Sequence, residues 1–401
     1  MAILHPFAST RPTAEFAKVV SSVPYDVVSV AEARSLARGN PRSFLHVIRP
    51  EINFEEDIDE HDARVYASGA EQLRAFAGAD YTVTDREPGL YIYRLVMDGR
   101  SQTGIFGCVS VADYDNNVIL KHENTRPDKE DDRTRHIVEQ RAHAEPVMLT
   151  YKDDTGAGEV IRRETVREPA IDFTADDGVR HSLWRAADSD ELVAQFRAIP
   201  KLYIADGHHR CKAASRAAQT LRGTGVSPEV GFFPAVLFPM GDLKILPYNR
   251  TIRNLPGGAS SFLDTLSNHF ALRADADPTP SAPGNVSIYT EGRWYGLTLP
   301  DTGRDGVDSR LDVARLGEHL LEPLLGIANP RTDPNIDFVG GIRGVDELRA
   351  RVDRGDAALA ISMFATSIEE LVSVSDAGLL MPPKSTWFEP KLRSGLLVHH
   401  F

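Results

Sequence analysis

The chain has 401 residues, of which 45 are Lys or Arg and 58 are Asp or Glu, so its formal net charge at pH 7 is −13. This charge argues against a protein that coats nucleic acid nonspecifically, because that kind of binding depends on cations that displace phosphate counterions. The apolar fraction of 42% and the charged fraction of 26% are typical of a globular protein, and the length allows two or three domains.

Two further features limit the class of protein. Cys108 and Cys211 are the whole cysteine content, which excludes a disulfide framework and a cysteine-rich zinc site. No stretch approaches the ~18 consecutive apolar residues of a membrane-spanning helix. The first residues also lack the apolar core of a signal peptide. We therefore expect a cytoplasmic protein with no membrane partner.

In the first half of the chain, the hydrophobic periodicity predicts mainly strands and polar helices. In chain order, we expect a helix within 57–77, strands at 90–96 and 104–111, a helix at 129–143 and a strand at 146–151. The Asp98-Gly99 pair between the first two strands is a turn signal, so these strands should form a hairpin.

The sharpest local pattern lies between residues 201 and 223. Leu202 to Ala205 is a short buried-strand run, and the polar segment 206–210 interrupts it. Alanines then recur on one helical face up to Leu221, and Gly223 is a stop signal. The pattern predicts a strand, a tight turn and a helix that packs closely on a sheet.

The second half of the chain predicts further strands and helices. In chain order, these are strands at 234–238 and 243–246, a hairpin of 286–289 with 294–299, helices at 312–325 and 345–354, and a strand at 357–364. The segment 381–392 is too rich in proline for regular structure. Composition places the domain boundaries so that three regions result, 1–89, 90–255 and 256–401.

The turn Asp206-Gly207-His208-His209-Arg210 is the first candidate for chemistry. A helix start offers backbone N–H groups without intrahelical acceptors and a partial positive charge, so it suits an anion. Gly207 would let the backbone approach a phosphate, and the three residues after it supply donors and charge. Asp206 could hold Mg²⁺ or accept hydrogen bonds as a helix N-cap.

The segment 121–143 is the second candidate. Glu123 follows the apolar run 118–120, where a strand end would present its carboxylate as a general base or a metal ligand. Asp132, His136 and His143 are spaced by four and seven residues, hence on one helical face. They predict either a metal site or, more commonly, a solvated charged face.

The proline-rich tail is the third candidate. Lys384-Ser385-Thr386 with Gly378 nearly matches a phosphate-binding P-loop, but Pro383 stands where the second glycine belongs and has no N–H to offer. We therefore exclude a P-loop. Lys384 could still reach a phosphate, or the tail could simply pack against the protein. Arg250, directly after a predicted strand, is a further cation for an anionic ligand.

Five segments together resemble one prokaryotic family, catalogued as domain of unknown function 1015. They are Arg11-Pro12, Pro24-Tyr25-Asp26, His122-Glu123-Asn124-Thr125, the turn 206–210 and the ending 382–392, in order from about Phe7 to Val398. The chain departs from the family's pattern at Cys211, where relatives more often carry an aromatic residue, and at Asn249, which replaces a common His.

The turn 206–210 also resembles the phosphate-binding turn of the ParB/sulfiredoxin-like fold. That fold includes kinases of free serine, CTP-binding DNA-partitioning proteins and sulfiredoxin. The resemblance implies an α/β fold with a mixed sheet, in which a ParB/sulfiredoxin-like core carries N- and C-terminal extensions. In the serine kinases an upstream glutamate is the catalytic base, and Glu123 is the match we choose here.

The resemblance implies a phosphotransferase that uses Mg²⁺ and a nucleotide, ATP or ADP, to phosphorylate a small polar hydroxyl metabolite, first of all free L-serine. The expected roles are catalysis by Glu123 and Asp206, with Asp206 also the metal ligand; phosphate binding by Gly207, His208, His209 and Arg210, with Lys384 and Arg250 further out; and substrate binding by His122, Thr125 and Arg133.

Three alternatives stay open. The chain could be a nucleotide-binding regulatory protein of the ParB type without turnover, or a nucleotide hydrolase. The charge of −13 and the lack of a basic recognition helix argue against nucleic acid as a partner. Redox repair related to sulfiredoxin would need Cys211 as a nucleophile with a pKa lowered by Arg210; the other role for Cys211 is packing. The sequence carries no signal for an oligomeric state.

Overall fold

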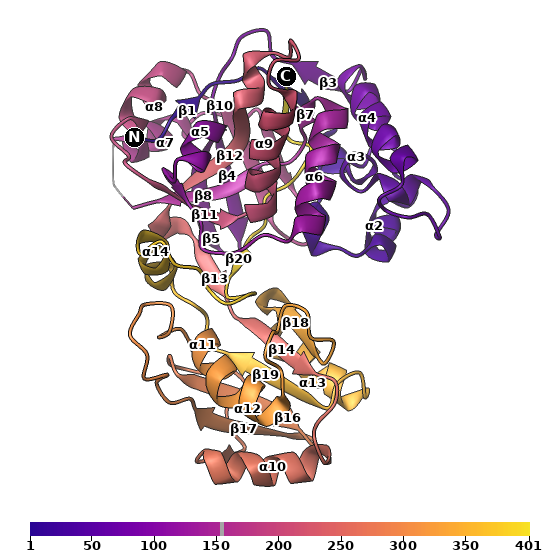
Figure 1. The fold of residues 1–401 in the computed structure, drawn as a ribbon. Helices are drawn as coiled ribbons and strands as arrows, with labels where there is room; N and C mark the ends of the chain where they lie inside the picture. Colours follow the sequence, from indigo (N-terminus) through magenta and orange to yellow (C-terminus); the bar gives the residue numbers. More distant parts are fainter. Residues whose placement is uncertain (153–155) are drawn as a thin grey trace. The chain divides into compact units, whose positions relative to one another are not determined.

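The computed structural model describes residues 1–152 and 156–401 (Figure 1). The chain divides into two compact units. The first unit consists of Met1–Lys121, Thr125–Leu243 and Pro390–Phe401, and the second of His122–Asn124 and Lys244–Glu389. The second unit is therefore largely an insertion between Leu243 and Pro390 of the first. No helix among the described residues is long and apolar enough to cross a membrane.

A nine-stranded mixed sheet forms the centre of the first unit. Its strands follow the order β6 (Ile119–Leu120), β11 (Leu202–Asp206), β8 (Val147–Tyr151), β12 (Phe232–Pro239), β5 (Arg100–Ser110), β4 (Tyr91–Met97), β10 (Arg180–Arg185) and β9 (Ile171–Thr174), with β1 (Leu4–His5) beside β5. The pairs β6–β11 and β8–β12 are parallel and the other pairs antiparallel. This mixed sheet confirms the α/β fold class.

The helices α5 (Val111–Asp115), α7 (Ala157–Glu164), α8 (Ser189–Phe196) and α9 (His208–Leu221) bury apolar side chains in the same core as the sheet. Cys211 and Ala214 of α9 are 0% and 1% exposed. Small side chains on this face let the α9 backbone come close to the strands, which positions the start of α9 firmly at the end of β11.

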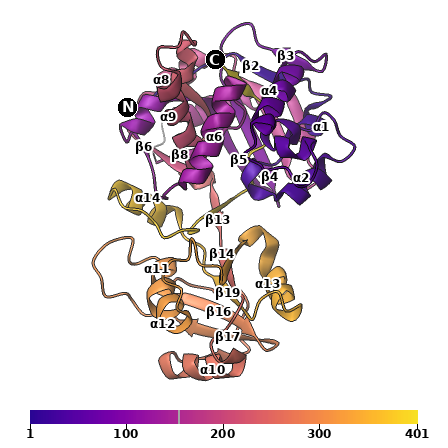
Figure 2. The same cartoon turned by 45° about the vertical axis from the view of Figure 1, so that its right-hand side comes forward.

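Helix α6 (Pro127–Gln140) lies beside α9 in both views (Figures 1 and 2). Around α6 the N-terminal part of the chain forms a second layer of α1 (Ala17–Val20), η1 (Tyr25–Val27), α2 (Val30–Ala37), α3 (Leu45–Ile48), η2 (Pro50–Asn53) and α4 (Ala63–Ala77). A small sheet of β3 (Thr82–Thr84), β2 (Ser9–Pro12), β21 (Val398–His400) and β7 (Ala142–His143) joins the two ends of the chain.

The second unit is an antiparallel sheet with helices around its own core. The strands follow the order β15 (Arg273–Ala274), β17 (Arg293–Thr298), β16 (Asn285–Thr290), β19 (Leu359–Met363), β14 (Tyr248–Ile252) and β18 (Ile336–Gly340). The helices are α10 (Gly258–His269), α11 (Asp312–Leu316), α12 (Glu322–Leu325), α13 (Gly344–Asp353) and α14 (Ile368–Asp376), with a π-helical turn at Gly317–Leu321. Strands β13 (Lys244–Leu246) and β20 (Trp387–Glu389) pair where the chain enters and leaves this unit.

Most of the elements expected from the sequence are present, and three expectations differ. The helix predicted at 129–143 ends at Gln140, because Arg141 adopts a left-handed conformation (φ 53°) and residues 142–143 form β7. The tail 381–392, expected to be irregular, contains the short strand β20. The compact units do not follow the three expected regions, since residues 1–89 share a unit with the large sheet, and the unit boundary falls after Leu243.

Candidate functional site

The turn between β11 and α9 has the strand–turn–helix form that its sequence predicts. Gly207 is the residue before the first helical position, with φ 100° and ψ 31°. A Cβ at this position would come 3.1 Å from both Val147 Cγ1 and Arg210 Nε. Because L-residues rarely adopt this φ and the space is already filled, the turn requires glycine.

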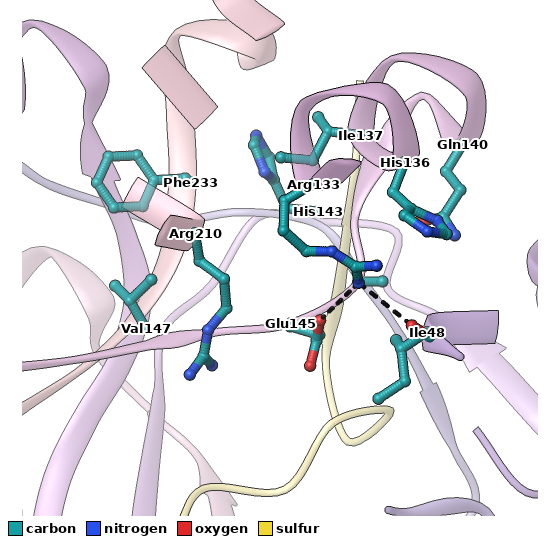
Figure 3. A pocket seen from close by; sticks show the side chains of 11 residues that line it. Ile48, Arg133, His136, Ile137, Gln140, His143, Glu145, Val147, Arg210 and Phe233 are labelled. Atoms are coloured by element: carbon teal, nitrogen blue, oxygen red, sulfur yellow. Dashed lines mark hydrogen bonds and ion pairs between the residues drawn. The ribbon is translucent and has the colours of Figure 1, made fainter. Parts of the chain in front are cut away.

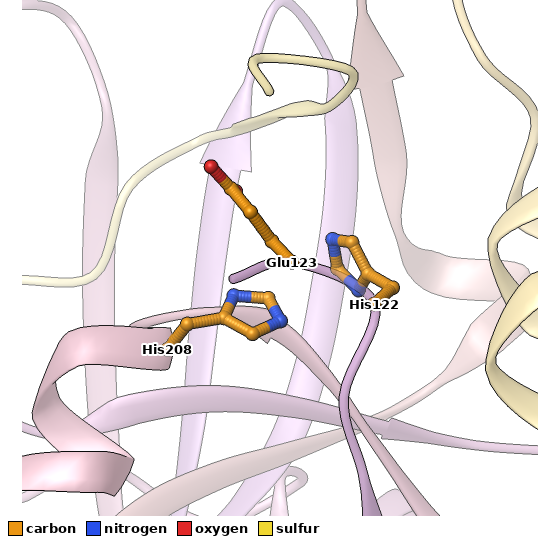
Figure 4. A group of neighbouring side chains, drawn as sticks. All are labelled: His122, Glu123 and His208. Carbon is orange, nitrogen blue, oxygen red and sulfur yellow. The ribbon is translucent and has the colours of Figure 1, made fainter. Parts of the chain in front are cut away.

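The first turn of α9 presents backbone amides and two histidines at the end of β11, and Figure 4 shows the first of these, His208. Gly207 has no side chain that could cap these amides. The side chain of His208 is buried, and Nε2 of His209 accepts a hydrogen bond of 3.0 Å from the backbone N–H of Arg126. The start of this 14-residue helix is therefore electropositive and suited to an anion.

Asp206, the last residue of β11, is held by two cations. Its Oδ2 accepts a 2.7 Å hydrogen bond from Nη2 of Arg210, and its Oδ1 accepts one of 3.1 Å from Nζ of Lys391. Burial by itself would raise the pKa of Asp206, but Lys391 and Arg210 outweigh it and hold the pKa well below its usual range. Asp206 therefore stays ionised at neutral pH.

Arg210 connects the turn to the N-terminal part of the first unit. Its side chain is 7% exposed and donates to the backbone oxygen of Pro146 as well as to Asp206. Nη2 also lies 3.7 Å from Oδ2 of Asp26. Burial opposes the charged guanidinium, but Asp26 and Asp206 raise its pKa above the ordinary value, so Arg210 is a permanent cation here.

A small cavity lies behind Arg210, with a volume of about 30 Å³ (Figure 3). Its lining includes Arg133, His136, Glu145 and Arg210. Arg133 donates two hydrogen bonds to Asp132 at 2.9 and 2.7 Å, and its Nη1 lies 3.9 Å from Oε2 of Glu145. The cavity is large enough for a water molecule and is lined by charges of both signs.

Glu145 ties three parts of the chain together. Its side chain is 7% exposed, and Oε1 accepts hydrogen bonds from the backbone N–H of Tyr25 at 3.1 Å and from Oγ of Ser394 at 3.2 Å. Burial raises its pKa, although Arg210 and Arg133 act in the opposite direction. Glu145 thus fixes the start of η1 against the C-terminal segment.

Two sequence hypotheses about the first unit need correction. The pKa of Cys211 is not lowered beside Arg210; burial raises it to about 12, so this thiol is unsuited to nucleophilic attack. Asp132, His136 and His143 do not lie on one helical face, because α6 ends at Gln140 and His143 lies on β7. Asp132 bonds Arg133 and Tyr66, and burial lowers the pKa of both histidines well below the usual range.

The residues expected in the site are divided between the two units. The turn 206–210, Thr125 and Arg133 belong to the first unit, in which the hydroxyl of Thr125 donates to Glu130. His122, Glu123, Arg250 and Lys384 belong to the second. The participation of these four residues in a site with the turn stays a prediction.

Within the second unit, the expected cations already have structural partners. Arg250 is 2% exposed and donates to the backbone oxygens of Tyr248 and Lys384, and burial lowers its pKa to about 10. His122 Nε2 lies 3.3 Å from Oγ1 of Thr386. Glu123 follows His122 on the segment after β6 (Figure 4).

Three residues that contact the turn or its cavity were missed by sequence reasoning, namely Asp26, Glu145 and Lys391. Asp26 and Lys391 do lie in segments that carry the family resemblance, 24–26 and 382–392, but only their positions in space reveal that they meet Arg210 and Asp206. Glu145 has no sequence signal, because an isolated glutamate before a strand is ordinary.

Solved structures similar to this chain include SbnI from Staphylococcus aureus, with a TM-score of 0.41 over 73% of this chain and 87% of that one. A free serine kinase in complex with AMP matches with a TM-score of 0.36 over 73% and 92%, and a conserved hypothetical protein from Pyrococcus furiosus with 0.36 over 73% and 95%. Each is 12% identical to this chain. At this level a likeness establishes no shared activity.

No curated protein matches the chain. A family model described as "Protein of unknown function (DUF1015)" matches residues 4–314, more than three quarters of the sequence. The match extends over nearly the whole first unit, including the turn 206–210, and into the second. The chain belongs to this family, as the resemblance in its sequence implies.

Proposed function

We propose that this protein is a phosphotransferase that moves a phosphoryl group from a nucleotide to a small hydroxyl metabolite. The observation that carries the proposal is the electropositive turn between β11 and α9, where a left-handed Gly207 leads into the start of a 14-residue helix. Backbone amides, the helix dipole and the adjacent Arg210 and Lys391 together suit the phosphates of a nucleotide.

Phosphoryl transfer depends mainly on positioning and on neutralising the charge of the transferred group. His208, His209 and Arg210 would bind phosphate oxygens. Asp206 fits a role at Mg²⁺, since each carboxylate oxygen keeps a second lone pair beside its hydrogen bond to Arg210 or Lys391. Asp206 is the residue that would hold the metal, which when bound would supply positive charge to offset that of the phosphates.

The choice of acceptor and base rests on the sequence resemblance. Free L-serine is the first acceptor to test, with ATP or ADP as the donor. The resemblance suggests Glu123 as the base. Lys384 and Arg250 are outer candidates for binding phosphate, and His122, Thr125 and Arg133 are candidates for binding the acceptor. A nucleotide-binding protein without turnover and a nucleotide hydrolase are the alternatives that the assay must separate from a kinase.

Product analysis tests the proposal directly. Purified protein is incubated with Mg²⁺, L-serine and, separately, ATP, ADP, CTP or pyrophosphate, and O-phosphoserine is measured by mass spectrometry. We expect phosphoserine with one of these donors, and its loss in Asp206→Asn and His208→Gln. Arg222→Gln is the matched control, because it removes a cation from the exposed far end of α9.

The outcomes separate the alternatives. Nucleotide binding without release of any product would favour a regulatory role. Free phosphate without phosphoserine would indicate a hydrolase or a different acceptor, which a panel of small hydroxyl compounds would identify. Equal activity of Asp206→Asn and the wild type would contradict the role given to the turn.

A further inference from the structure

Three carboxylates approach the Arg210 guanidinium, and they differ in what they are free to do. Asp206 has both oxygens in hydrogen bonds to cations, at 2.7 and 3.1 Å. Glu145 is 7% exposed and accepts hydrogen bonds from Tyr25 and Ser394. Asp26 is 35% exposed, and its contact with Arg210 is an ion pair at 3.7 Å, longer than a hydrogen bond.

The backbone that carries Asp26 is firmly held. The preceding residue, Tyr25, is 4% exposed, its N–H donates to Glu145, and its carbonyl accepts a 3.2 Å hydrogen bond from Nη1 of Arg49. The Arg133 guanidinium also lies 4.1 Å from the centre of the Tyr25 ring. A short 3₁₀ helix thus presents a part-exposed carboxylate on a rigid support beside the turn.

We propose that Asp26, in place of Glu123, is the catalytic base that accepts the hydroxyl proton in the phosphoryl transfer, an inference that rests on the proposed function. The acceptor O–H bond breaks and its proton passes to the Asp26 carboxylate. The oxygen's electron pair forms the new bond to the terminal phosphorus of the donor nucleotide. The bond from that phosphorus to the bridging oxygen breaks, and the shortened nucleotide leaves with the electron pair.

Geometry supports Asp26 in this role over its two neighbours. The same Nη2 of Arg210 contacts Asp206 at 2.7 Å and Asp26 at 3.7 Å, so Asp26 lies beside the turn proposed to bind phosphate. Asp206 is held by two cations that disfavour its protonation, whereas Glu145 is enclosed. Of these three, Asp26 combines exposure to an incoming hydroxyl with a carboxylate oxygen that no cation holds by hydrogen bond among the described residues.

The competing explanation is that Asp26 only neutralises Arg210, and kinetics distinguish the two roles. For a base, Asp26→Asn should lower kcat about 100-fold or more. The KM for the acceptor and the Kd for the nucleotide should stay within about threefold, and the acidic limb of the pH profile of kcat should disappear. Asp26→Glu should restore part of the rate. A neutralising role would instead weaken nucleotide binding and leave the pH profile of kcat unchanged.

The experiment compares wild type, Asp26→Asn, Asp26→Glu and Glu123→Gln in the phosphoserine assay, with thermal unfolding of each. Asp172→Asn is the matched control, because Asp172 is 32% exposed and also paired with an arginine, Arg180, but lies on β9 at the far edge of the sheet. Active wild type with an equally active Asp26→Asn overturns this inference and leaves the proposed function standing. If the wild type is inactive with every donor and every hydroxyl acceptor, both this inference and the proposed function are removed.

Discussion

The buried histidine His181 on β10 should make the first unit lose stability on mild acidification. It is 1% exposed, Nδ1 lies 2.7 Å from the hydroxyl of Tyr93, and Nε2 accepts a hydrogen bond of 3.3 Å from Nε of Arg393. Burial, helped by the positive charge of Arg393, lowers its pKa from 6.5 to about 3. The folded protein therefore keeps this imidazole neutral at pH values where the unfolded chain protonates it.

The sign and size follow from proton linkage. Below pH 6.5 the unfolded chain binds a proton that the folded state refuses, so the free energy of unfolding falls as the pH falls, until about pH 3. Between pH 8 and pH 5, His181 alone should remove about 2 kcal/mol of stability. In His181→Gln, whose amide can still donate to Tyr93 and accept from Arg393, this loss should be smaller by about the same 2 kcal/mol.

Urea unfolding at pH 8, 7, 6 and 5 measures this difference. Trp184, which is buried on the same strand, reports on the first unit when Trp294 and Trp387 of the second unit are replaced by Phe. His269→Gln, at an exposed position, is the control. If the free energy of unfolding has the same pH dependence in His181→Gln as in the otherwise identical protein with His181, the reasoning is refuted. That result would mean that His181 does not remain neutral in the folded state.

Three further substitutions test the turn, its cations and the packing of the large sheet. Gly207→Ala should destabilise the protein by about 1–2 kcal/mol, because its φ of 100° strains any L-residue; urea unfolding measures it, and no loss would contradict the turn geometry. Lys391→Met should lower the free energy of unfolding by about 1–3 kcal/mol at pH 7, because it removes one of the two cations at Asp206. A double-mutant cycle with Asp206→Asn should give a coupling energy above about 1 kcal/mol. Gly104→Ala should lower the free energy of unfolding by about 1–3 kcal/mol, because the alanine Cβ would come within 2.6 Å of the Leu237 backbone oxygen. An unchanged melting temperature would show that β5 and β12 lie farther apart than this contact requires.

The sequence predicts the local elements of the site well and its assembly poorly. The turn after β11 is predictable because its signals are local, namely a buried run, then Asp-Gly, then alanines at helical spacing. The end of helix α6 was predicted three residues too late, because Arg141 carries no glycine-like signal for its left-handed conformation. Local periodicity also cannot show which charged side chains, far apart in the sequence, form ion pairs in the fold.

The tail shows this limit most clearly. Lys384 looked like the phosphate-binding cation because Ser385 and Thr386 follow it, yet its backbone oxygen accepts from Arg250 in the second unit. Lys391, seven residues later and without any motif, bonds Asp206. Only the return of residues 390–401 to the first unit separates the two lysines, and that return is set by long-range strand pairing.

This return also predicts which fragment of the chain can fold. Strand β21 pairs with β2 and β7, and Leu396, Leu397 and Val398 are at most 1% exposed. Burial of these three side chains contributes about 5–9 kcal/mol, as much as the whole stability of many domains. A fragment ending at Leu243 should therefore be unfolded or insoluble, even though it contains the turn 206–210.

A shortened chain can keep the strand without the second unit. Lys244 and Glu389 are opposite residues in the β13–β20 pair, so Leu243 and Pro390 lie where a linker of a few Gly and Ser residues can join them. We expect residues 1–243, linked in this way to 390–401, to unfold cooperatively in thermal circular dichroism, and the fragment 1–243 to show no such transition. A fragment 1–243 as stable as the linked chain would contradict the argument that the first unit needs its C-terminal strand. It would also contradict the stabilising role of the segment that brings Lys391 to Asp206.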